Sequence, residues 1–164
     1  MVSFELTQEQ LAMQAMAKNF SREYLVPIAL EYDERDEFPW EAFRRAHELG
    51  LVNTCIHPEY GAVGLDTLSS CLIAEEVSGG CTGFWCSLNA NYIVSLVLGL
   101  AGSLDQKRIY LGQLVEKPIL ASFALTEPNA GSDAGSLTTY ARRQDNGYVI
   151  NGSKCFITDR RAHV

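Results

Sequence analysis

Residues 77–104 contain no charged side chain, and this run limits the folds that the 164-residue chain can adopt. An uncharged run of this length is either a membrane span or a helix packed among other helices. Ser87, Asn89, Asn91 and Ser95 interrupt the run, and its most apolar part, 92–101, is shorter than the roughly 20 residues that a bilayer requires. We therefore predict a central helix that other helices cover on all sides, and no membrane span.

Signals for helix starts and stops precede this run. Thr7 and Gln10 have the spacing of a capping box, and Pro39 is typical of a first helical turn. The predicted elements are a helix from Thr7 that Pro27 interrupts, a shorter helix to Tyr32, a solvated turn over 33–37, a helix from Pro39 to Gly50, a connector over 51–66 and a helix from Asp66 or Thr67 to Gly79 and Gly80.

Apolar spacing predicts which side of each helix faces inward. A second capping box at Ser103 and Gln106 predicts a further helix that ends at Lys117 and Pro118. The residues expected to face the core are Leu68, Cys71, Leu72 and Val77 in the helix after Asp66, and Ile109 and Leu114 in the helix after Gln106.

After Pro118 the apolar pattern changes from a helical period to a strand-like one. The predicted strands cover 119–125, 137–144, 148–150 and 154–158, and Asn146-Gly147 and Asn151-Gly152 are strong hairpin signals. The predicted fold class is α+β, with an all-α N-terminal helical bundle over 1–117 and an incomplete antiparallel β-barrel domain over 118–164. Because short strands would leave an open edge, we expect further chain or a partner to complete it.

Charge and cysteine use argue against several classes of function. The net charge of −7, without a cluster of Lys and Arg, argues against nucleic acid as a partner. Five cysteines without a C-x-x-C pair predict free, mostly buried thiols, and His47, His57 and His163 lack metal-ligand spacing, so we expect no metal. The N-terminal residues carry no export signal, although a mature organellar protein without its presequence fits equally well.

Residues 123–133, F-A-L-T-E-P-N-A-G-S-D, combine residue types that neither packing nor solubility selects together. The apolar segment 119–125 leads into a bend that contains Thr126, Glu127 and Ser132. Such a bend exposes backbone N–H groups, and this concavity suits an anionic ligand or a polar ring. Taken alone, the pattern fits an ordinary β-turn as well as a ligand site.

Together with Y-V-I-N-G-S-K-C-F-I-T at 148–158, this stretch resembles the acyl-CoA dehydrogenase family, flavoenzymes that form the α,β-double bond of acyl thioesters. The resemblance covers essentially the whole chain. The motifs E-L-G-L, G-C-T-G and D-Q-K-x-x-Y-L make it most similar to the short- and medium-chain branches. The resemblance implies a helical domain packed on a middle β-barrel, with FAD against the barrel face.

The resemblance also implies roles for single residues. Thr126 would contact the pyrimidine side of the isoalloxazine, Phe156 would cover the ring, and Thr158 would hydrogen-bond near N5, the atom that accepts hydride. Gly131 and Ser132 would approach the pyrophosphate and the acyl-CoA. The full implied FAD-binding set is Phe123, Ala124, Leu125, Thr126, Gly131, Ser132, Phe156, Ile157 and Thr158.

Two segments depart from the family pattern. Phe156 stands where Trp is more usual, and D-R-R follows Thr158 where many relatives have N-G, so we expect a different loop on the flavin side. Trp85, Cys86 and Asn89 fall where relatives line the acyl pocket, and Ser132 completes the implied substrate-binding set. The large indole of Trp85 would shorten this pocket and favour a short or branched acyl group. An ordinary core role for Trp85 is the equally weighted alternative.

No catalytic residue is assigned within this chain. The family's glutamate base lies beyond the matched part, Glu75-Glu76 is typical of a helix surface, and Glu127 belongs to the bend. We therefore expect the N-terminal portion of an FAD-dependent acyl-CoA dehydrogenase that is inactive alone.

The expected partners are an acyl-CoA substrate and an electron-transfer flavoprotein, with a homo-oligomeric, tetrameric parent protein. The expected compartment is the bacterial cytoplasm or the mitochondrial matrix. The alternative hypotheses are a truncated, non-catalytic relative that acts as an interaction module, and a relative of the acyl-CoA oxidase type.

Overall fold

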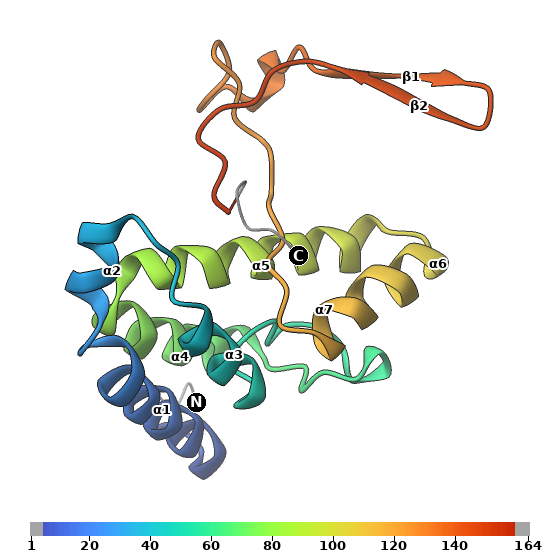
Figure 1. Cartoon of the computed structure of the whole chain (residues 1–164). Coiled ribbons are helices and arrows are strands. Elements are labelled where there is room, and N and C mark those ends of the chain that lie inside the picture. The colour runs from blue at the N-terminus through green and yellow to red at the C-terminus, as the bar shows by residue number, and fades with distance from the viewer. Residues whose placement is uncertain (1–4, 160–164) are drawn as a thin grey trace.

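A computed structural model describes residues 5–159 and shows a bundle of helices from which a β-hairpin extends (Figure 1). Arg160 and Arg161, expected to alter the loop after Thr158, lie outside the described residues, as does His163. The helices are α1 (Gln8–Phe20), α2 (Ala29–Arg35), α3 (Trp40–Glu48), α4 (Thr67–Gly80), α5 (Thr82–Ala101), α6 (Leu104–Gln106) and α7 (Gly112–Glu116). Single π-helical turns cover Ser21–Leu25 and Lys107–Leu111, 3-10 turns cover Pro58–Tyr60 and Ala134–Ser136, and the strands are β1 (Tyr140–Gln144) and β2 (Gly147–Asn151).

The predicted helix starts are confirmed at both capping boxes. The Thr7 hydroxyl accepts a hydrogen bond from the Gln10 N–H, and the Gln10 side chain accepts one from the Thr7 N–H. Ser103 and Gln106 make the same pair of bonds at the start of α6. Each pair satisfies two backbone donors that a helix start leaves without a partner, so these starts are determined locally.

Helix α2 is longer than predicted. The solvated turn expected over 33–37 is wrong in its first half, because the helix continues to Arg35 and ends where Asp36 takes a left-handed backbone with φ of 53°. An ion pair one turn apart, from Arg35 to Glu31 at 2.8 Å, supports the added residues. The next prediction is confirmed, since α3 begins directly after Pro39.

The main core lies among α1, α3, α4 and the first turns of α5. Its centre is a group of aromatic rings, in which Phe38 stacks on Phe84 with centroids 5.9 Å apart and Phe20 lies 6.1 Å from Phe84. The buried members of this core are Ala17, Phe20, Leu25, Ala42, Phe43, Ala46, Leu51, Val52, Ile73, Val77, Phe84 and Leu88. Burial of this apolar surface is the main source of stability for the bundle.

A second, smaller core joins the C-terminal half of α5 to α7. Ile56, Leu111 and Leu114 are buried there, and Val94 of α5 packs against them. The side-chain amide of Asn53 donates a hydrogen bond to the Leu114 carbonyl oxygen at 2.7 Å. The bundle therefore has two packed centres along one long helix.

The uncharged run forms α5, as predicted, but other helices do not cover it on all sides. Leu96, Val97 and Leu100 are exposed, Leu100 to 84%. The buried residues of α5 are Phe84, Ser87, Leu88, Ala90, Asn91 and Ser95, which leaves several polar groups on the inner face. Length and composition alone would let α5 cross a bilayer, with 33% of its most apolar window buried, so the absence of a membrane span stays a prediction.

The inward faces of α4 and of the α6–α7 region were only partly predicted. In α4, Leu72 and Val77 are buried, whereas Leu68 and Cys71 are exposed and the small residues Ser69 and Ser70 take the inner face. Ser70 can lie there because its hydroxyl has a polar partner, the Thr54 hydroxyl, at 3.0 Å. Small polar residues with a partner therefore replace larger apolar ones on this face.

The π-helical turn Lys107–Leu111 explains why the inward face of the α6–α7 region was only partly predicted. Leu114 is buried as predicted, but Ile109 is 54% exposed and Leu111 is buried in its place. A π turn contains one residue more than an α turn, so the side chains around it are rotated relative to a regular helix. The apolar spacing of the sequence assumes a regular helix and cannot show this shift.

All five cysteines are free thiols, as predicted, but none of them is buried. Cys71 and Cys86 are exposed on the outer sides of α4 and α5, and the other three are partly buried. Cys81 has a local role at the start of α5, where its sulfur accepts the N–H of Phe84 at 3.4 Å. The expectation of mostly buried thiols is therefore wrong.

The hairpin predicted at Asn146-Gly147 is confirmed. β1 and β2 pair antiparallel, with Tyr140 opposite Asn151 and Gln144 opposite Gly147, and all of their residues are exposed. β1 begins at Tyr140 rather than at residue 137.

The other strand predictions are wrong in the described part of the chain. Residues 119–125 are extended but pair with no strand, and 154–158 form no strand either. No turn forms at Asn151-Gly152, because Asn151 still pairs with Tyr140 in the first hairpin and Gly152 packs directly on Thr139. The domain boundary placed between 117 and 118 stays a prediction.

Gly80 provides a test of the helix packing. A Cβ at Gly80 would lie 2.0 Å from the Ser21 Oγ and 3.2 Å from the Ser21 Cβ, because α4 passes close to the preceding π-helical turn. We expect Gly80→Ala to lower the free energy of unfolding by about 1–3 kcal/mol, measured by urea denaturation.

Gly79→Ala is the matched control. It lies in the same last turn of α4, and an added Cβ there meets nothing within 4 Å. We expect this variant to be neutral or to stabilise the chain by up to about 1 kcal/mol, because Ala favours helix more than Gly does. Equal unfolding midpoints for the two variants would contradict the close approach at Gly80.

Candidate functional site

Glu127 is a buried carboxylate in the bend that follows the extended segment 119–126. It accepts hydrogen bonds from the N–H and the hydroxyl of Thr138 at 2.7 Å each, from the N–H of Thr139 at 2.9 Å and from the Lys154 Nζ at 2.9 Å. Hydrogen bonds from Thr139, Thr138 and Lys154 hold the pKa of the Glu127 carboxyl well below its ordinary value of 4.5. The carboxylate thus ties the bend to the chain on both sides of the hairpin.

Lys154 completes this connection. Its Nζ also donates to the Leu125 carbonyl oxygen at 2.7 Å. The adjacent Cys155 N–H donates to the Thr126 carbonyl oxygen at 3.0 Å. The chain that enters the bend and the chain that leaves the hairpin therefore lie side by side, although about 29 residues of sequence separate Leu125 from Lys154.

These contacts leave a set of backbone donors free. None of the N–H groups of 122–126 and 156–158 donates a hydrogen bond to another residue within 5–159. We call these two segments the N–H wall. Exposed backbone donors bond to water, and a ligand with hydrogen-bond acceptors along a flat edge can take the place of that water.

Phe156 stands out within the N–H wall. Its side chain is 92% exposed, and its backbone has a left-handed φ of 57°. A bulky residue seldom adopts this conformation, which costs roughly 1–3 kcal/mol and tends to occur at functional sites. The structure therefore places an unpacked aromatic ring at the edge of a strip of free donors.

Asn91 anchors the start of the extended segment to the bundle. This fully buried residue of α5 donates from Nδ2 to the Ile119 carbonyl oxygen at 3.0 Å, and its Oδ1 accepts the Ala121 N–H at 2.6 Å. The side-chain amide thereby replaces the two backbone groups of a neighbouring strand. Asn91 sets where the chain leaves the bundle on its way to the N–H wall.

Most of the predicted FAD residues lie on the surface. Phe123, Ala124, Leu125, Gly131, Ser132, Phe156 and Thr158 are exposed, and Thr126 and Ile157 are partly buried. Within the bend, Glu127 and Ala130 exchange both backbone hydrogen bonds, at 3.0 and 3.1 Å, which turns the chain tightly before Gly131. A Cβ added at Gly131 would meet nothing within 4 Å, so the space above it is open.

The predicted acyl-pocket residues lie together on α5 but on different sides of it. Trp85 is partly buried and packs against the main core, Asn89 is partly buried, and Cys86 is exposed. This arrangement is compatible with an acyl-pocket role for Trp85 and with an ordinary core role. The acyl-pocket role of Trp85 therefore stays a prediction.

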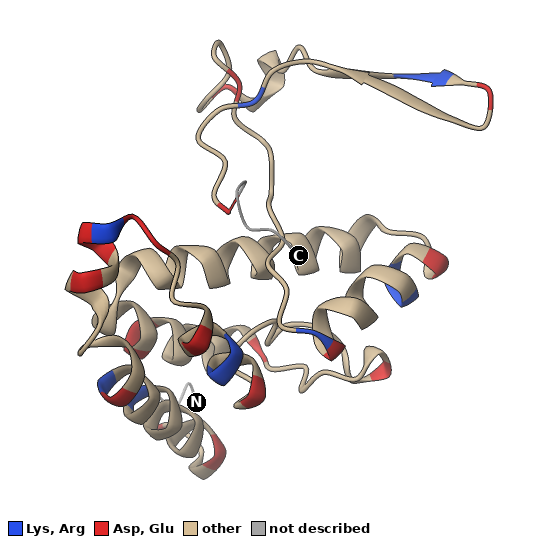
Figure 2. Cartoon of the chain, in the orientation of Figure 1, with Lys and Arg blue, Asp and Glu red and all other residues tan. Residues whose placement is uncertain are grey.

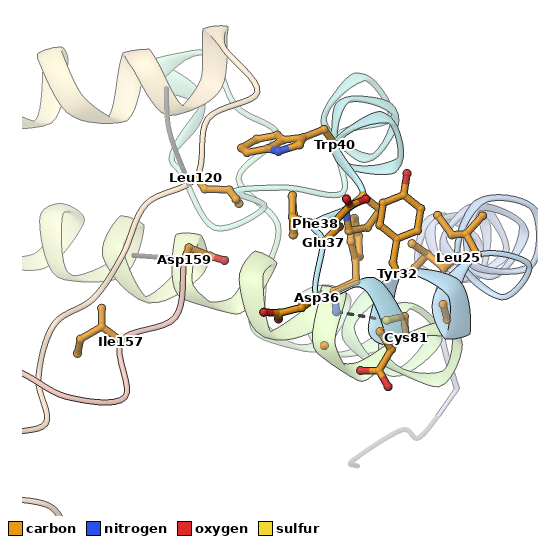
Figure 3. Close-up of a pocket in the computed structure, with 16 residues that line it drawn as sticks. Leu25, Tyr32, Asp36, Glu37, Phe38, Trp40, Cys81, Leu120, Ile157 and Asp159 are labelled. Atoms are coloured by element: carbon orange, nitrogen blue, oxygen red, sulfur yellow. Dashed lines mark hydrogen bonds between the residues drawn. The ribbon is translucent and has the colours of Figure 1, made fainter. Parts of the chain in front are cut away.

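A cleft of about 660 Å³ lies beside these residues, between α2, the start of α5 and the loop after the N–H wall (Figure 3). Phe38, Trp40 and Leu120 are apolar lining residues, and Asp36 and Glu37 are acidic ones. Ile157 is the one predicted site residue that lines the cleft, which Trp85, Cys86, Asn89 and Ser132 do not.

Charged side chains are spread unevenly over the described surface. Carboxylates gather at the end of α2, and the basic residues are scattered, with Arg142 and Arg143 adjacent on β1 (Figure 2). Within residues 5–159, no group of three or more His, Cys, Asp or Glu side chains is arranged to hold a metal ion.

Three important residues were missed or underestimated from the sequence. Glu127 was assigned to the bend, but its partners are distant in sequence and no local pattern identifies them. Asn91 had one signal, a large polar residue in an uncharged helical run. Asp159, described below, had a signal in its departure from the family pattern.

Comparisons with family models, curated proteins and solved structures all find acyl-CoA dehydrogenases. Residues 7–118 match the model of the acyl-CoA dehydrogenase N-terminal domain, and 122–162 match that of the middle domain. A probable mitochondrial medium-chain specific acyl-CoA dehydrogenase of Caenorhabditis briggsae is 45% identical over 157 residues, which are 96% of this chain and 38% of that protein.

Solved structures share the fold. An acyl-CoA dehydrogenase of Bacillus anthracis complexed with FAD has a TM-score of 0.89 and 36% identity, covering 99% of this chain and 28% of its own. A chain in the structure of the electron transferring flavoprotein of Acidaminococcus fermentans has a TM-score of 0.91 and 34% identity, covering 98% and 43%. The chain thus spans less than half the length of these relatives.

The contacts of Glu127 predict a specific sensitivity to acid. Because the folded state lowers the pKa of Glu127 below 4.5, its contribution to stability is complete above that value and is lost as the pH falls toward the folded pKa. We expect the protection of the Thr138 and Thr139 amides from hydrogen exchange to decrease between about pH 5 and pH 2.

Glu127→Gln should reduce this protection at neutral pH and remove most of its pH dependence. Glu116→Gln, at an exposed carboxylate on α7, is the control and should leave the protection unchanged. Equal protection in wild type and Glu127→Gln at all pH values would show that the carboxylate does not hold the bend.

Asn91 provides a second test. Asn91→Ala leaves the Ala121 N–H and the Ile119 carbonyl oxygen without their partner, so we expect a loss of about 2–4 kcal/mol in the free energy of unfolding. Ser95→Ala is the matched control on α5, because the buried Ser95 hydroxyl has no partner among the described residues and its removal should be neutral or stabilising. The denaturation midpoints of the two variants test whether Asn91 anchors the extended segment. Similar midpoints for Asn91→Ala and Ser95→Ala would exclude this role.

Proposed function

Because the chain belongs to the acyl-CoA dehydrogenase family, we propose that its N–H wall forms one side of an FAD site. The residues proposed to contact FAD are Phe123, Ala124, Leu125, Thr126, Gly131, Ser132, Phe156, Ile157 and Thr158. When bound, FAD supplies the electron acceptor for oxidation of an acyl thioester. The chain's own residues bind and orient the two molecules.

The free donors of the N–H wall are the observation that carries this proposal. The pyrimidine half of a flavin presents carbonyl oxygens and ring nitrogens along one edge, and these are acceptors that match N–H groups from 122–126 and 156–158. Donors at this edge also stabilise the negative charge that develops on reduction. The exposed ring of Phe156 offers an apolar cover next to these donors.

The contacts of the Glu127 carboxylate support the same proposal, because they fix the N–H wall in the absence of a ligand. Glu127 accepts hydrogen bonds from Thr138, Thr139 and Lys154, and Lys154 also donates to the Leu125 carbonyl oxygen, so these contacts hold the wall without using its N–H donors. A binding surface that is fixed before the ligand arrives loses less entropy on binding. We assign Glu127 a holding role and no catalytic one.

For the substrate we propose an acyl-CoA, with Ser132 near the CoA and Trp85, Cys86 and Asn89 along the acyl chain. The bulk of Trp85 favours a short or branched acyl group. The activity proposed for the whole protein is α,β-dehydrogenation, with the catalytic base outside residues 1–164. An electron-transfer flavoprotein as electron acceptor, a homotetrameric assembly, and a location in the bacterial cytoplasm or the mitochondrial matrix complete the proposal.

Flavin binding tests the proposal directly. The product of the complete gene should purify with the visible absorbance of a flavin, and this absorbance should bleach when an acyl-CoA is added. Phe156→Ala should weaken FAD binding about three- to tenfold, because it removes one aromatic contact.

Tyr110→Ala is the matched control for Phe156→Ala. It removes another exposed aromatic side chain, on the π-helical turn of the helical bundle and outside the N–H wall, and should leave FAD affinity unchanged. A colourless product that does not take up added FAD would contradict the proposal and favour a non-catalytic interaction module.

A further inference from the structure

Asp159, which directly follows the N–H wall, is joined to α5 by one side-chain hydrogen bond. The Ser87 hydroxyl donates a hydrogen bond to the Asp159 Oδ1 at 2.7 Å. Ser87 is buried on the inner face of α5, and Asp159 lies beside that helix, two residues after Ile157 of the N–H wall (Figure 3). Among residues 5–159, this is the only hydrogen bond between α5 and the chain that follows β2.

Asp159 is held in an enclosed and unusual position. Its backbone has a left-handed φ of 63°, which turns the chain back toward α5. Burial raises the pKa of its carboxyl, and the hydrogen bond from Ser87 acts in the opposite direction. The second carboxylate oxygen, Oδ2, is buried without a hydrogen-bond partner among the described residues. A carboxylate kept in such surroundings calls for an explanation beyond packing.

The two ends of this contact belong to different parts of the proposed site. Ser87 lies within one helical turn of Trp85, Cys86 and Asn89 on α5, whereas Asp159 directly follows the 156–158 segment of the N–H wall. A hydrogen bond between them therefore fixes the position of the wall relative to the acyl-pocket helix. Small displacements between reacting groups have large effects on rate, so this distance matters for catalysis.

We propose that Asp159 and Ser87 are positioning residues that hold the flavin side of the site in register with the acyl side. This inference rests on the function proposed above. Neither residue needs to touch FAD or the acyl group, since both act through the segments that they join. A general structural role would instead lower stability without a selective effect on ligands.

Two single variants and their combination test the proposal in the product of the complete gene. Ser87→Ala and Asp159→Ala should each weaken the binding of butyryl-CoA, followed by the change in flavin absorbance, about tenfold, because a hydrogen bond to a charged group is lost. The double variant should be no weaker than either single variant, because both remove the same bond. Asp159→Asn keeps an acceptor oxygen at the Oδ1 position and should bind within about threefold of wild type.

Ser95→Ala is the control, since it makes the same change on the same helix at a hydroxyl that has no partner among residues 5–159. It should leave butyryl-CoA binding unchanged, and unfolding midpoints should be recorded for every variant. If wild type binds FAD and butyryl-CoA but Ser87→Ala and Asp159→Ala bind as Ser95→Ala does, or lose affinity only in proportion to stability, the positioning role is wrong. If wild type binds neither ligand, the proposed function fails, and this inference fails with it.

Discussion

The hydrogen bonds of the Glu127 carboxylate hold together the part of the chain that follows the helical bundle. A buried carboxylate is costly unless donors surround it, and here two N–H groups, a hydroxyl and an ammonium group do so. These donors come from Thr138, Thr139 and Lys154, so one side chain connects the bend to both ends of the hairpin. Extended segments can therefore lie side by side without a continuous ladder of strand hydrogen bonds.

A second constraint acts at α5, where the Asn91 side chain makes the two backbone hydrogen bonds that a neighbouring strand would otherwise make. The buried face of this helix carries Ser87, Asn91 and Ser95, while apolar residues such as Leu100 are exposed. Asn91 bonds the backbone of the extended segment, and Ser87 bonds the loop that returns after the hairpin. The lack of charge in this helix thus reflects its neutral polar contacts to backbone and carboxylate as well as its packing against other helices.

The sequence predicts those features that depend on neighbouring residues. The capping boxes at Thr7 and Ser103 and the Asn146-Gly147 hairpin involve residues at most a few positions apart, and the structure confirms them. Side-chain direction is harder to predict, because the π-helical turn at 107–111 rotates Leu111 inward and Ile109 outward without any residue pattern that announces it. The bend at 123–133 was recognised as a candidate site, but the long-range contacts of Glu127 and Asp159 were not, since their partners lie far away in sequence.

Glu127 and Asn91 hold the N–H wall in place, and the wall itself presents free backbone donors. This division of roles determines which residues can provide ligand specificity. Backbone N–H groups of the N–H wall are the same whatever side chains the residues carry, so the proposed binding of a flavin there would tolerate many substitutions. Under the proposed function, discrimination between ligands depends on the exposed side chains of the wall, above all Phe156. Glu127 and Asn91 themselves permit little change, because replacing either one leaves several polar groups without partners at once. We therefore expect substitutions of Glu127 or Asn91 to affect folding and the position of the N–H wall together, and substitutions at the exposed Phe156 to leave the fold intact.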